Sequence, residues 1–273
     1  MKIDAHVHVL DPKQFPYAPD VWYEPIGAEQ GTAADLAQVM TYHGVQHAML
    51  VQPNSGYGYD NRAMLSAIAK YKTEDGKGRF KGMAVVKNNA SLGELQDLQA
   101  QGIVGIAMNA ALLGVDFYAD IEPLLAHLRE LDMWAQMQVQ HDQLLTLSPM
   151  LEASGAKLMF DHCGRPEPTA GVAQSGFQAL LKLAETGRAA VKLSGINKCS
   201  VQQYPWADAK PFVDALVGAY TPQNLIWASD WPFLKAPARI DYGPLLTLFE
   251  ALVPDAAARH AIQWETPKRL FGF

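Results

Sequence analysis

Two histidines separated by one residue lie near the beginning of the sequence, in the segment MKIDAHVHVL. His6 and His8 have the spacing of neighbours on one face of a β-strand. Imidazole rings so placed can serve as metal ligands, acid–base groups or hydrogen-bond donors to a substrate. Two buried polar rings on a central strand need a ligand or a polar network to satisfy them. A position on the solvent-facing side of an edge strand is therefore the less favoured interpretation.

Two further segments place reactive side chains at the ends of apolar runs. In LMFDHCGRP, Asp161 and His162 follow an apolar stretch directly, and LIWASD ends in Asp230. A carboxylate in such a position can act as a general base towards water or as a metal ligand. Because three separate apolar runs end in His, His and Asp chemistry, capping or packing alone is a poor explanation.

The elements that must position these side chains form a regular alternation of strands and helices. Eight apolar segments have the length and composition of strands. They cover residues 2–9, 47–53, 80–86, 103–109, 133–139, 156–162, 189–195 and 225–230. Segments with apolar residues three and four apart, most with a glycine near the end, predict helices between them. These lie at 32–43, 60–71, 91–102, 120–132, 143–155, 175–187 and 209–220, with a final helical segment from about 244 to 270.

Eight strand–helix units predict parallel strands, because each crossover returns the chain to the same end of the sheet. Closure of this sheet gives an α/β fold, a (β/α)8 TIM-like barrel, which accounts for residues 1–273 as a single domain. An open doubly wound sheet is the alternative, but no G-x-G-x-x-G segment follows the first strand. In a barrel, active sites form at the carboxyl ends of the strands, which is where the histidines and Asp230 fall.

One connection, at residues 10–31 after the first strand, is much longer than the others and contains four prolines and four aromatic residues. Loops of this length in compact domains are usually functional, and the aromatic content argues against disorder. We expect it to form a lid or a pocket wall over the mouth of the barrel. A surface meander packed on neighbouring helices is the alternative.

The composition disfavours several classes of function. Apolar residues make up 49 % of the chain and charged residues 18 %, and the net charge of -6 argues against nucleic acid or an anionic membrane as the partner. The two cysteines, Cys163 and Cys199, form no C-x-x-C pair, and no 18-residue apolar run occurs. We expect a cytoplasmic enzyme that acts on a small molecule, and no pattern indicates its oligomeric state.

Six segments together have the character of a family signature. They are DAHVHV at 4–9, VQPNSGYGYDNR at 51–62, FDHCGRP at 160–166, VKLSG at 191–195, WASDWP at 227–232 and RLFGF at 269–273. With these segments in this order along the whole chain, the sequence resembles the amidohydrolase superfamily. Within it, the similarity is to the branch that contains 2-pyrone-4,6-dicarboxylate lactonase, the fuconolactonases and other sugar or muconolactone lactonases. The resemblance implies a distorted barrel of the amidohydrolase type that hydrolyses a C–O or C–N bond by attack of water.

The resemblance also implies roles for individual residues. Asp230 is the implied general base, which takes a proton from water and returns it to the leaving oxygen. His6, His8 and His162 are implied to polarise the lactone carbonyl by hydrogen bonding. Loop structure or a hydrogen bond within the barrel is the alternative interpretation of most of the candidates for substrate contact. These candidates are Asn54, Tyr57, Tyr59, Asn61, Asn109, Gln138, Arg165, Lys198 and Trp231.

Metal-dependent relatives carry a histidine or a carboxylated lysine at the end of the fifth strand. This chain has MWAQMQVQHD there, with glutamines alternating on one face. Glutamine is a poor zinc ligand, so we expect catalysis without a metal cofactor. His141, next to these glutamines, leaves a Zn or Mn site open as the alternative. The ligands of that alternative site are His6, His8 and Asp230.

Three departures from the branch concern the substrate. Ala107 in GIAMN and Lys198 in GINKCS stand where relatives have arginines, and Phe233 stands where many have histidine. Because arginine matches the geometry of carboxylates, we expect a less charged pocket than that of a dicarboxylate lactonase. The predicted function is hydrolysis of a lactone or a related cyclic ester. The alternatives are a metal-dependent amidohydrolase or decarboxylase, a lactone isomerase and, least favoured, a non-catalytic sugar-acid binding barrel.

Overall fold

The computed structural model describes residues 1–72, 78–236, 238 and 240–273. Eight parallel strands form one sheet in sequence order, as the alternation predicts. They are β1 (Ile3–Val7), β2 (His47–Val51), β3 (Phe80–Ala84), β4 (Ile103–Asn109), β5 (Trp134–Gln138), β6 (Lys157–Phe160), β7 (Ala189–Leu193) and β8 (Leu225–Trp227). The first and last strands meet where the Asp230 N–H donates to the His6 carbonyl at 3.0 Å and the His8 N–H donates to the Trp231 carbonyl at 2.8 Å. The sheet is therefore a nearly closed barrel, and the predicted TIM-like fold is confirmed.

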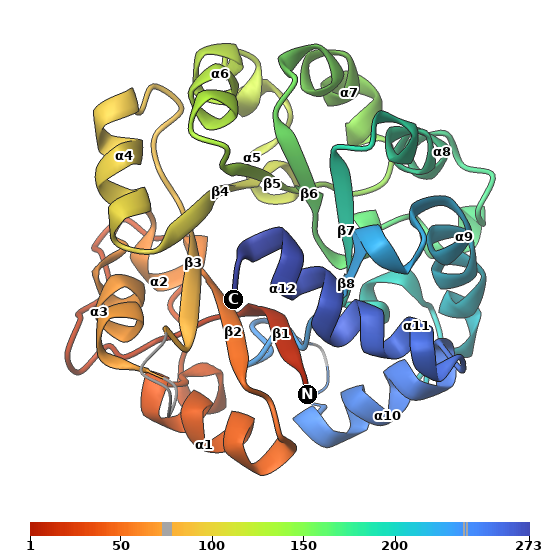
Figure 1. Cartoon of the computed structure of the whole chain (residues 1–273), viewed down its shortest axis with the longest axis horizontal. Helices are drawn as coiled ribbons and strands as arrows, with labels where there is room; N and C mark the ends of the chain where they lie inside the picture. Colours follow the sequence, from red (N-terminus) through yellow and green to blue (C-terminus); the bar gives the residue numbers. More distant parts are fainter. Residues whose placement is uncertain (73–77, 237, 239) are drawn as a thin grey trace.

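Helices surround the barrel and alternate with its strands (Figure 1). The helices that match the predicted ones are α1 (Ala33–His43), α3 (Arg62–Lys70), α4 (Leu92–Ala100), α6 (Glu122–Glu130), α7 (Gln143–Ser154), α8 (Ser175–Leu183), α9 (Lys210–Tyr220) and α10 (Tyr242–Leu252). Local chemistry sets several of their ends. The Thr32 and Ser91 hydroxyls, for example, accept from the backbone N–H three residues on and complete capping boxes.

The helical structure differs from the prediction in two places. Two short helices, α2 (Asn54–Tyr57) and α5 (Ala110–Leu113), follow β2 and β4 where loops were expected. The final segment is divided after α10, because Pro254 has no N–H to continue the helix. It resumes as α11 (Ala256–His260), a π-helical turn at Ala261–Glu265 and α12 (Thr266–Phe271).

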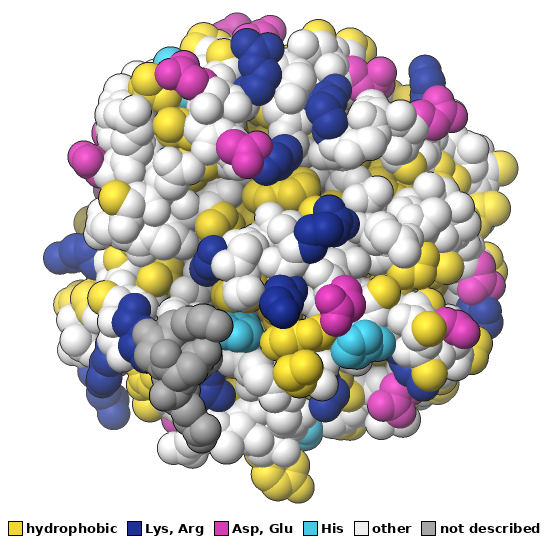
Figure 2. Space-filling model, viewed as in Figure 1, with side chains coloured by type: hydrophobic (Ala, Val, Ile, Leu, Met, Phe, Trp, Pro, Cys, Tyr) yellow, Lys and Arg dark blue, Asp and Glu magenta, His cyan; other side chains and the backbone are white. Residues whose placement is uncertain are grey.

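Helix α12 covers the amino-terminal end of the barrel, the end that faces the viewer in Figure 1. The Lys81 ammonium of β3 donates to the Phe271 carbonyl at 2.5 Å, and the Trp134 indole of β5 donates to the Leu270 carbonyl at 3.3 Å. Phe271 packs with the apolar interior of the barrel, which includes Met49 and Met159. On this face, basic and acidic side chains are interspersed (Figure 2). The opposite, carboxyl end of the strands is left to form the site.

The long connection at 10–31 packs against α2 beside the mouth of the barrel. The Ala18 N–H donates to the Gly56 carbonyl at 2.8 Å, and the Gly56 N–H donates to the Tyr23 carbonyl at 2.9 Å. A Cβ at Gly56, whose φ is +75°, would lie 2.7 Å from the Tyr17 ring, so glycine suits this contact. None of the helices in the described ranges combines the length and the hydropathy needed to span a bilayer.

Candidate active site

A cavity opens at the carboxyl end of the barrel, with a volume of about 1060 Å³ including its open mouth. Its walls come from strand ends and βα loops, the place where active sites of such barrels lie. Trp22 of the long connection and Lys235 of the segment after β8 also line it. The other polar residues that line it are His6, His8, Gln52, Asn54, Ser55, Asn109, Gln136, Gln138, Asp161, His162, Arg165, Lys198 and Asp230.

Three imidazole rings converge on a single carboxylate oxygen inside this cavity. The distances to Asp230 Oδ1 are 3.5 Å from His8 Nε2, 3.7 Å from His6 Nε2 and 3.9 Å from His162 Nε2. The other oxygen, Oδ2, accepts a hydrogen bond from the Lys198 ammonium at 2.8 Å. The structure thus brings together the four residues that the sequence suggested for catalysis, from β1, the turn after β6 and the end of β8.

An unusual backbone turn brings His162 and Arg165 to the cavity. Strand β6 ends at Phe160, and φ is then positive at four successive residues, with values of 52° at His162, 55° at Cys163, 75° at Gly164 and 46° at Arg165. Left-handed conformations of this kind are costly for residues other than glycine and are concentrated at functional sites. Because the strand has already ended, Cys163 follows His162 within this turn and not on the opposite face of an extended strand. Cys163 is fully buried in the hydrophobic core.

His162 is supported from β7 and the residues after it. Its Nδ1 lies 3.0 Å from the hydroxyl of Ser194. Gly195, with φ of +57°, passes directly beneath the ring, where an added Cβ would lie 2.8 Å from the His162 Cβ and 2.9 Å from its Nδ1. Glycine at this position therefore sets the place of the ring as well as the conformation of the turn.

The hydrogen bond of His8 determines which of its nitrogens carries the proton. Nδ1 lies 2.8 Å from the Val51 carbonyl oxygen, which can only accept. The Nδ1 atom is therefore the protonated one in the neutral ring, and Nε2 presents a lone pair to the cavity. Neutral His8 is then an acceptor on the side that faces Asp230.

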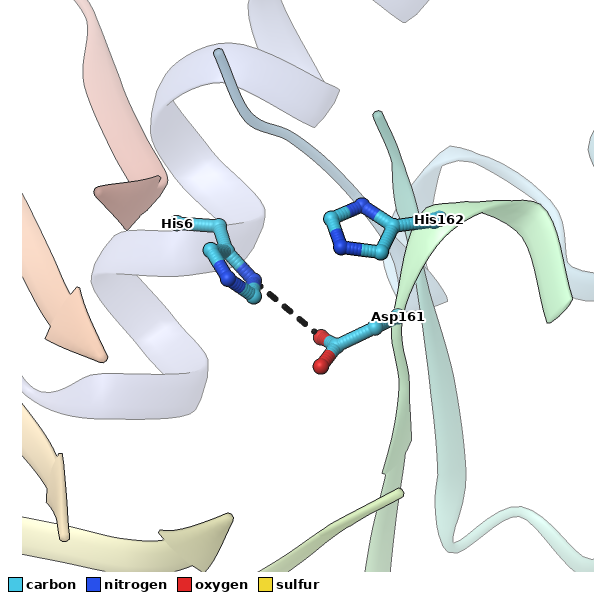
Figure 3. A group of neighbouring side chains, drawn as sticks. All are labelled: His6, Asp161 and His162. Atoms are coloured by element: carbon cyan, nitrogen blue, oxygen red, sulfur yellow. Dashed lines mark hydrogen bonds and ion pairs between the residues drawn. The ribbon is translucent and has the colours of Figure 1, made fainter. Parts of the chain in front are cut away.

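A network that the sequence did not reveal lies beneath the three rings. The Lys192 ammonium of β7, fully buried, lies 3.1 Å from His6 Nδ1, 3.0 Å from Asp161 Oδ1 and 2.7 Å from the Gln136 amide oxygen. Gln136 in turn donates to Asp161 Oδ2 at 2.9 Å, and Asp161 Oδ1 lies 3.3 Å from His6 Nδ1. Figure 3 shows His6, His162 and Asp161 pointing towards one another. A lysine within the otherwise apolar run AAVKL was the signal that could have found this network.

Burial and neighbouring charges together perturb the site. Burial raises the pKa of Asp230, but the Lys198 ammonium and the His162 ring outweigh it and hold that pKa well below 3.8. Burial, supported by the charge of Lys192, lowers the pKa of His6 from 6.5 to about 4. Burial and the charge of Lys198 also lower the pKa of His162 well below 6.5. The site at neutral pH therefore combines an ionised carboxylate with neutral His6 and His162 rings.

A second buried carboxyl group joins β1 to β8 outside the cavity. Asp4 accepts from the Tyr242 hydroxyl at 2.6 Å and from the Ser229 N–H at 3.0 Å. Burial raises the pKa of Asp4 from 3.8 to about 6, although these hydrogen bonds oppose the rise. Asp4 therefore supports the strand ends that carry the two histidines and Asp230.

The candidates for substrate contact divide into two groups. Asn54, Asn109, Gln138, Arg165 and Lys198 line the cavity. The described cavity lining does not include the other four candidates, whose side chains are engaged in packing or in loop structure or are exposed. The Tyr57 hydroxyl accepts from the Asp11 N–H, and the Asn61 side chain is hydrogen-bonded to the backbone of Val85. Tyr59 is 48 % exposed, and Trp231 is buried against Gly31.

His141 lies outside the group of converging rings. Strand β5 ends at Gln138, and His141 adopts a φ of 52° in the turn that follows. Its Nε2 lies 3.7 Å from Glu167 Oε2 on the surface, where the side chain is 57 % exposed. The cavity-facing positions of β5 are instead those of Gln136 and Gln138.

Among the described residues, two sets of side chains have ligand atoms close enough together to hold a metal ion. One set is His6, His8 and Asp230, and the other is His6, Asp161 and His162; within each, the ligand atoms lie within 4.8 Å of one another. The spacing suits a divalent ion. The charges suit a metal ion less well, because the carboxylate of each set is already paired with a lysine ammonium. Asp230 is paired with Lys198, and Asp161 is paired with Lys192.

A (β/α)8 barrel with histidines at the ends of β1 and β6 and an aspartate at the end of β8 defines the class of amidohydrolase-type enzymes. A family model described as Amidohydrolase matches residues 3–273, and the chain belongs to this family.

Curated and solved relatives agree with this assignment. A 4-sulfomuconolactone hydrolase from Rhizobium radiobacter is 32 % identical over 279 residues, which covers 98 % of this chain and 89 % of the relative. A D-galactarolactone isomerase from Agrobacterium fabrum is 26 % identical over 274 residues, with coverage of 98 % and 90 %. A crystal structure from Acinetobacter baumannii, of a protein described as a "probable 2-pyrone-4,6-dicarboxylic acid hydrolase" with citric acid bound, superposes on this chain with a TM-score of 0.87 at 29 % identity. The superposition covers 100 % of this chain and 99 % of that chain.

Proposed function

We propose that the protein hydrolyses a lactone or a related cyclic ester without a metal cofactor, with Asp230 as the general base. The convergence of three imidazoles on Asp230 Oδ1 carries this proposal. An ionised carboxylate can accept a proton from water, and the rings beside it can stabilise the oxyanion that forms as water attacks. The lactone hydrolases among the relatives support the same chemistry.

The proposed reaction needs one water molecule and no other reactant. The water oxygen attacks the ester carbonyl carbon while Asp230 takes a water proton, and the carbonyl oxygen becomes an oxyanion near His6 and His162. Collapse of this intermediate breaks the ring C–O bond, and Asp230 returns the proton to the departing oxygen. The product is an open-chain hydroxy acid, or its tautomer where an enol is released. Ionisation of the new carboxyl group releases a proton.

The three histidines are not equivalent in this scheme. His6 and His162 are positioned to donate from Nε2 to the developing oxyanion, provided that this nitrogen carries the proton. Neutral His8 cannot donate there, because its proton is committed to the Val51 carbonyl. Its Nε2 lone pair can instead accept a hydrogen bond from the attacking water and orient it towards the ester.

The cavity suggests a substrate with an anionic group that binds Arg165. The guanidinium of Arg165 lines the cavity and has no hydrogen-bond or ion-pair partner among the described residues. Arginine forms bidentate hydrogen bonds with carboxylate or sulfonate groups. Lys198 is already paired with Asp230, and Ala107 supplies no charge to the opposite wall. A lactone that carries a carboxylate or sulfonate fits this arrangement, with Asn54 and Gln138 available for its hydroxyl or carbonyl groups.

The connection at 10–31 is proposed to act as a wall of this pocket. Trp22 lines the cavity although it is 50 % exposed. The Lys235 ammonium lies 3.9 Å from the centre of the Trp22 ring, and the Lys235 N–H donates to Glu29 Oε1 at 2.7 Å. These contacts join the connection to the segment after β8 across one side of the mouth.

The test is proton release from a panel of muconolactones and sugar-acid lactones, measured with and without a chelator. We expect turnover that survives chelation and that falls by at least a thousandfold in Asp230→Asn, since loss of the base removes the proton acceptor. Asp214→Asn, at an exposed position of α9, is the matched control and should retain activity. Full activity of Asp230→Asn would refute the base, and loss of turnover on chelation would favour the metal-dependent alternative. Binding without turnover across the panel would favour a non-catalytic barrel.

Lactone isomerisation is a second candidate, because one relative is a D-galactarolactone isomerase. The same base could remove a proton from a hydroxyl of the substrate, which then attacks the carbonyl in place of water. Isomerisation releases no proton, so product analysis by NMR separates it from hydrolysis.

A further inference from the structure

Lys192 is fully buried on β7, and the proposed reaction does not use it. Its ammonium has three protons and no lone pair, and three acceptor atoms surround it at hydrogen-bond distance. These are the Gln136 amide oxygen at 2.7 Å, Asp161 Oδ1 at 3.0 Å and His6 Nδ1 at 3.1 Å. Each proton thus has one acceptor, and the third acceptor is the imidazole nitrogen that faces away from Asp230.

We propose that Lys192 is a positioning residue that fixes the tautomer of His6, so that Nδ1 accepts from Lys192 and Nε2–H faces the cavity as a donor. The inference deepens the proposed function, since it supplies the proton that an oxyanion donor needs.

The competing arrangement places the proton on His6 Nδ1 and directs it to Asp161 Oδ1, 3.3 Å away. That proton would then lie beside the Lys192 ammonium, with two donors facing each other at 3.1 Å. Asp161 does not require it, because its two oxygens already accept from Lys192 and Gln136.

The same arrangement works against a metal ion at His6. In metal sites the outward nitrogen of a histidine usually donates to a carboxylate or carbonyl, which leaves the other nitrogen free to bind the ion. Asp161 has the position of such a carboxylate. Because the Lys192 ammonium contacts both Asp161 Oδ1 and His6 Nδ1, Nδ1 accepts from Lys192, so His6 Nε2 keeps its proton and cannot act as a ligand together with His8 and Asp230.

The decisive measurement is the tautomer of His6, read from the nitrogen chemical shifts of protein labelled with ¹⁵N-histidine, with no substrate present. His6→Gln identifies the signals of this ring. In the wild type we expect the proton on Nε2. In Lys192→Met, whose side chain has similar length without a donor, Nδ1–H should turn to Asp161 and the tautomer should reverse. Lys198→Met removes a lysine that is paired with Asp230 and has no hydrogen bond to His6 Nδ1, so it should leave the tautomer of His6 unchanged.

Two further readouts follow from the reversal. Zinc binding measured by calorimetry should be at least tenfold tighter in Lys192→Met than in the wild type, because His6 Nε2 becomes free to bind. With a lactone substrate, kcat should fall by about a hundredfold at nearly unchanged KM, as expected when a donor to the oxyanion is lost. The tautomer and the zinc affinity are measured without turnover, so failure of the lactonase proposal would leave them interpretable.

A wild-type proton on Nδ1, or an unchanged tautomer in Lys192→Met, would overturn the inference. Lys192→Met leaves the Asp161 carboxylate without its cation and can fail to fold for that reason. Lys192→Met combined with Asp161→Asn removes both charges. Either nitrogen of His6 can then be protonated, since an amide both donates and accepts. A mixture of the two tautomers is expected in this double variant, and retention of Nε2–H alone would count equally against a role for Lys192.

Discussion

Substitution of Gly195 by alanine tests whether close packing beneath His162 places its ring. Gly195 has a φ of +57°, and an added Cβ would lie 2.8–2.9 Å from three atoms of His162, including its Cβ. The Cβ and Cγ atoms cannot move aside without the backbone, which is already in a left-handed turn. Gly195→Ala should therefore displace the ring and disturb its contact with Ser194.

The expected loss of stability has two parts. A left-handed alanine costs about 1–2 kcal/mol, and the lower entropy of the unfolded chain returns about 0.4–1 kcal/mol. Overpacking against His162 adds about 1–3 kcal/mol. Gly187→Ala is the matched control, because Gly187 has a similar φ of +66° and an added Cβ there meets nothing within 4 Å. We expect a loss of about 1 kcal/mol in the control and about 2–4 kcal/mol in Gly195→Ala.

Urea unfolding measures both variants, and lactone turnover follows the ring. Activity should remain near that of the wild type in Gly187→Ala and fall by about 10²–10³ in Gly195→Ala, the usual effect of losing an oxyanion donor. Equal stability of the two variants within about 0.5 kcal/mol, together with full activity of Gly195→Ala, would refute the packing role.

Three further predictions concern charge and pH. Because the pKa of Asp4 is raised to about 6 in the folded state, its contribution to stability is complete below 3.8 and is lost as the pH rises through 6. Asp4→Asn should remove this decline of about 3 kcal/mol in the free energy of unfolding, measured between pH 4 and 8. An unchanged decline in the variant would contradict the role of Asp4. Lys198→Met should raise the pKa of Asp230 and move the acidic limb of kcat/KM to higher pH, whereas an unmoved limb would show that Lys198 does not set the basicity of Asp230. Arg165→Met should raise KM about tenfold to a hundredfold for anionic lactones and leave neutral lactones unaffected, and equal effects on both would argue against an anion contact.

The fold and the positions of the candidate catalytic residues were accessible from the sequence because they depend on local patterns. Strand and helix periodicities repeat eight times, and parallel strands direct all their carboxyl ends to one side. The two-residue spacing of His6 and His8 placed them on one face, and Asp230 followed an apolar run. The mouth of a closed barrel then brings these residues together, whatever the details of the loops.

Residues in the loops were less predictable, since a polar side chain there can face the cavity or complete the loop. Tyr57 and Asn61 bond to the backbone of neighbouring segments, while Asn54, a few residues earlier, lines the cavity. The left-handed turn at His162 was also hidden, because it is held by packing against segments distant in the sequence, among them β7 and α9.

By itself, the sequence determined the barrel and the residue types at its mouth. Only the tertiary structure decided what those residues can do. Which nitrogen of His6 carries the proton depends on Lys192, which lies 186 positions away in the sequence. It also depends on Gln136 and Asp161, whose side chains meet Lys192 because of the registers of β5, β6 and β7. Hydrogen bonds act over about 3 Å, so a chain written in one dimension does not show which donor reaches which acceptor.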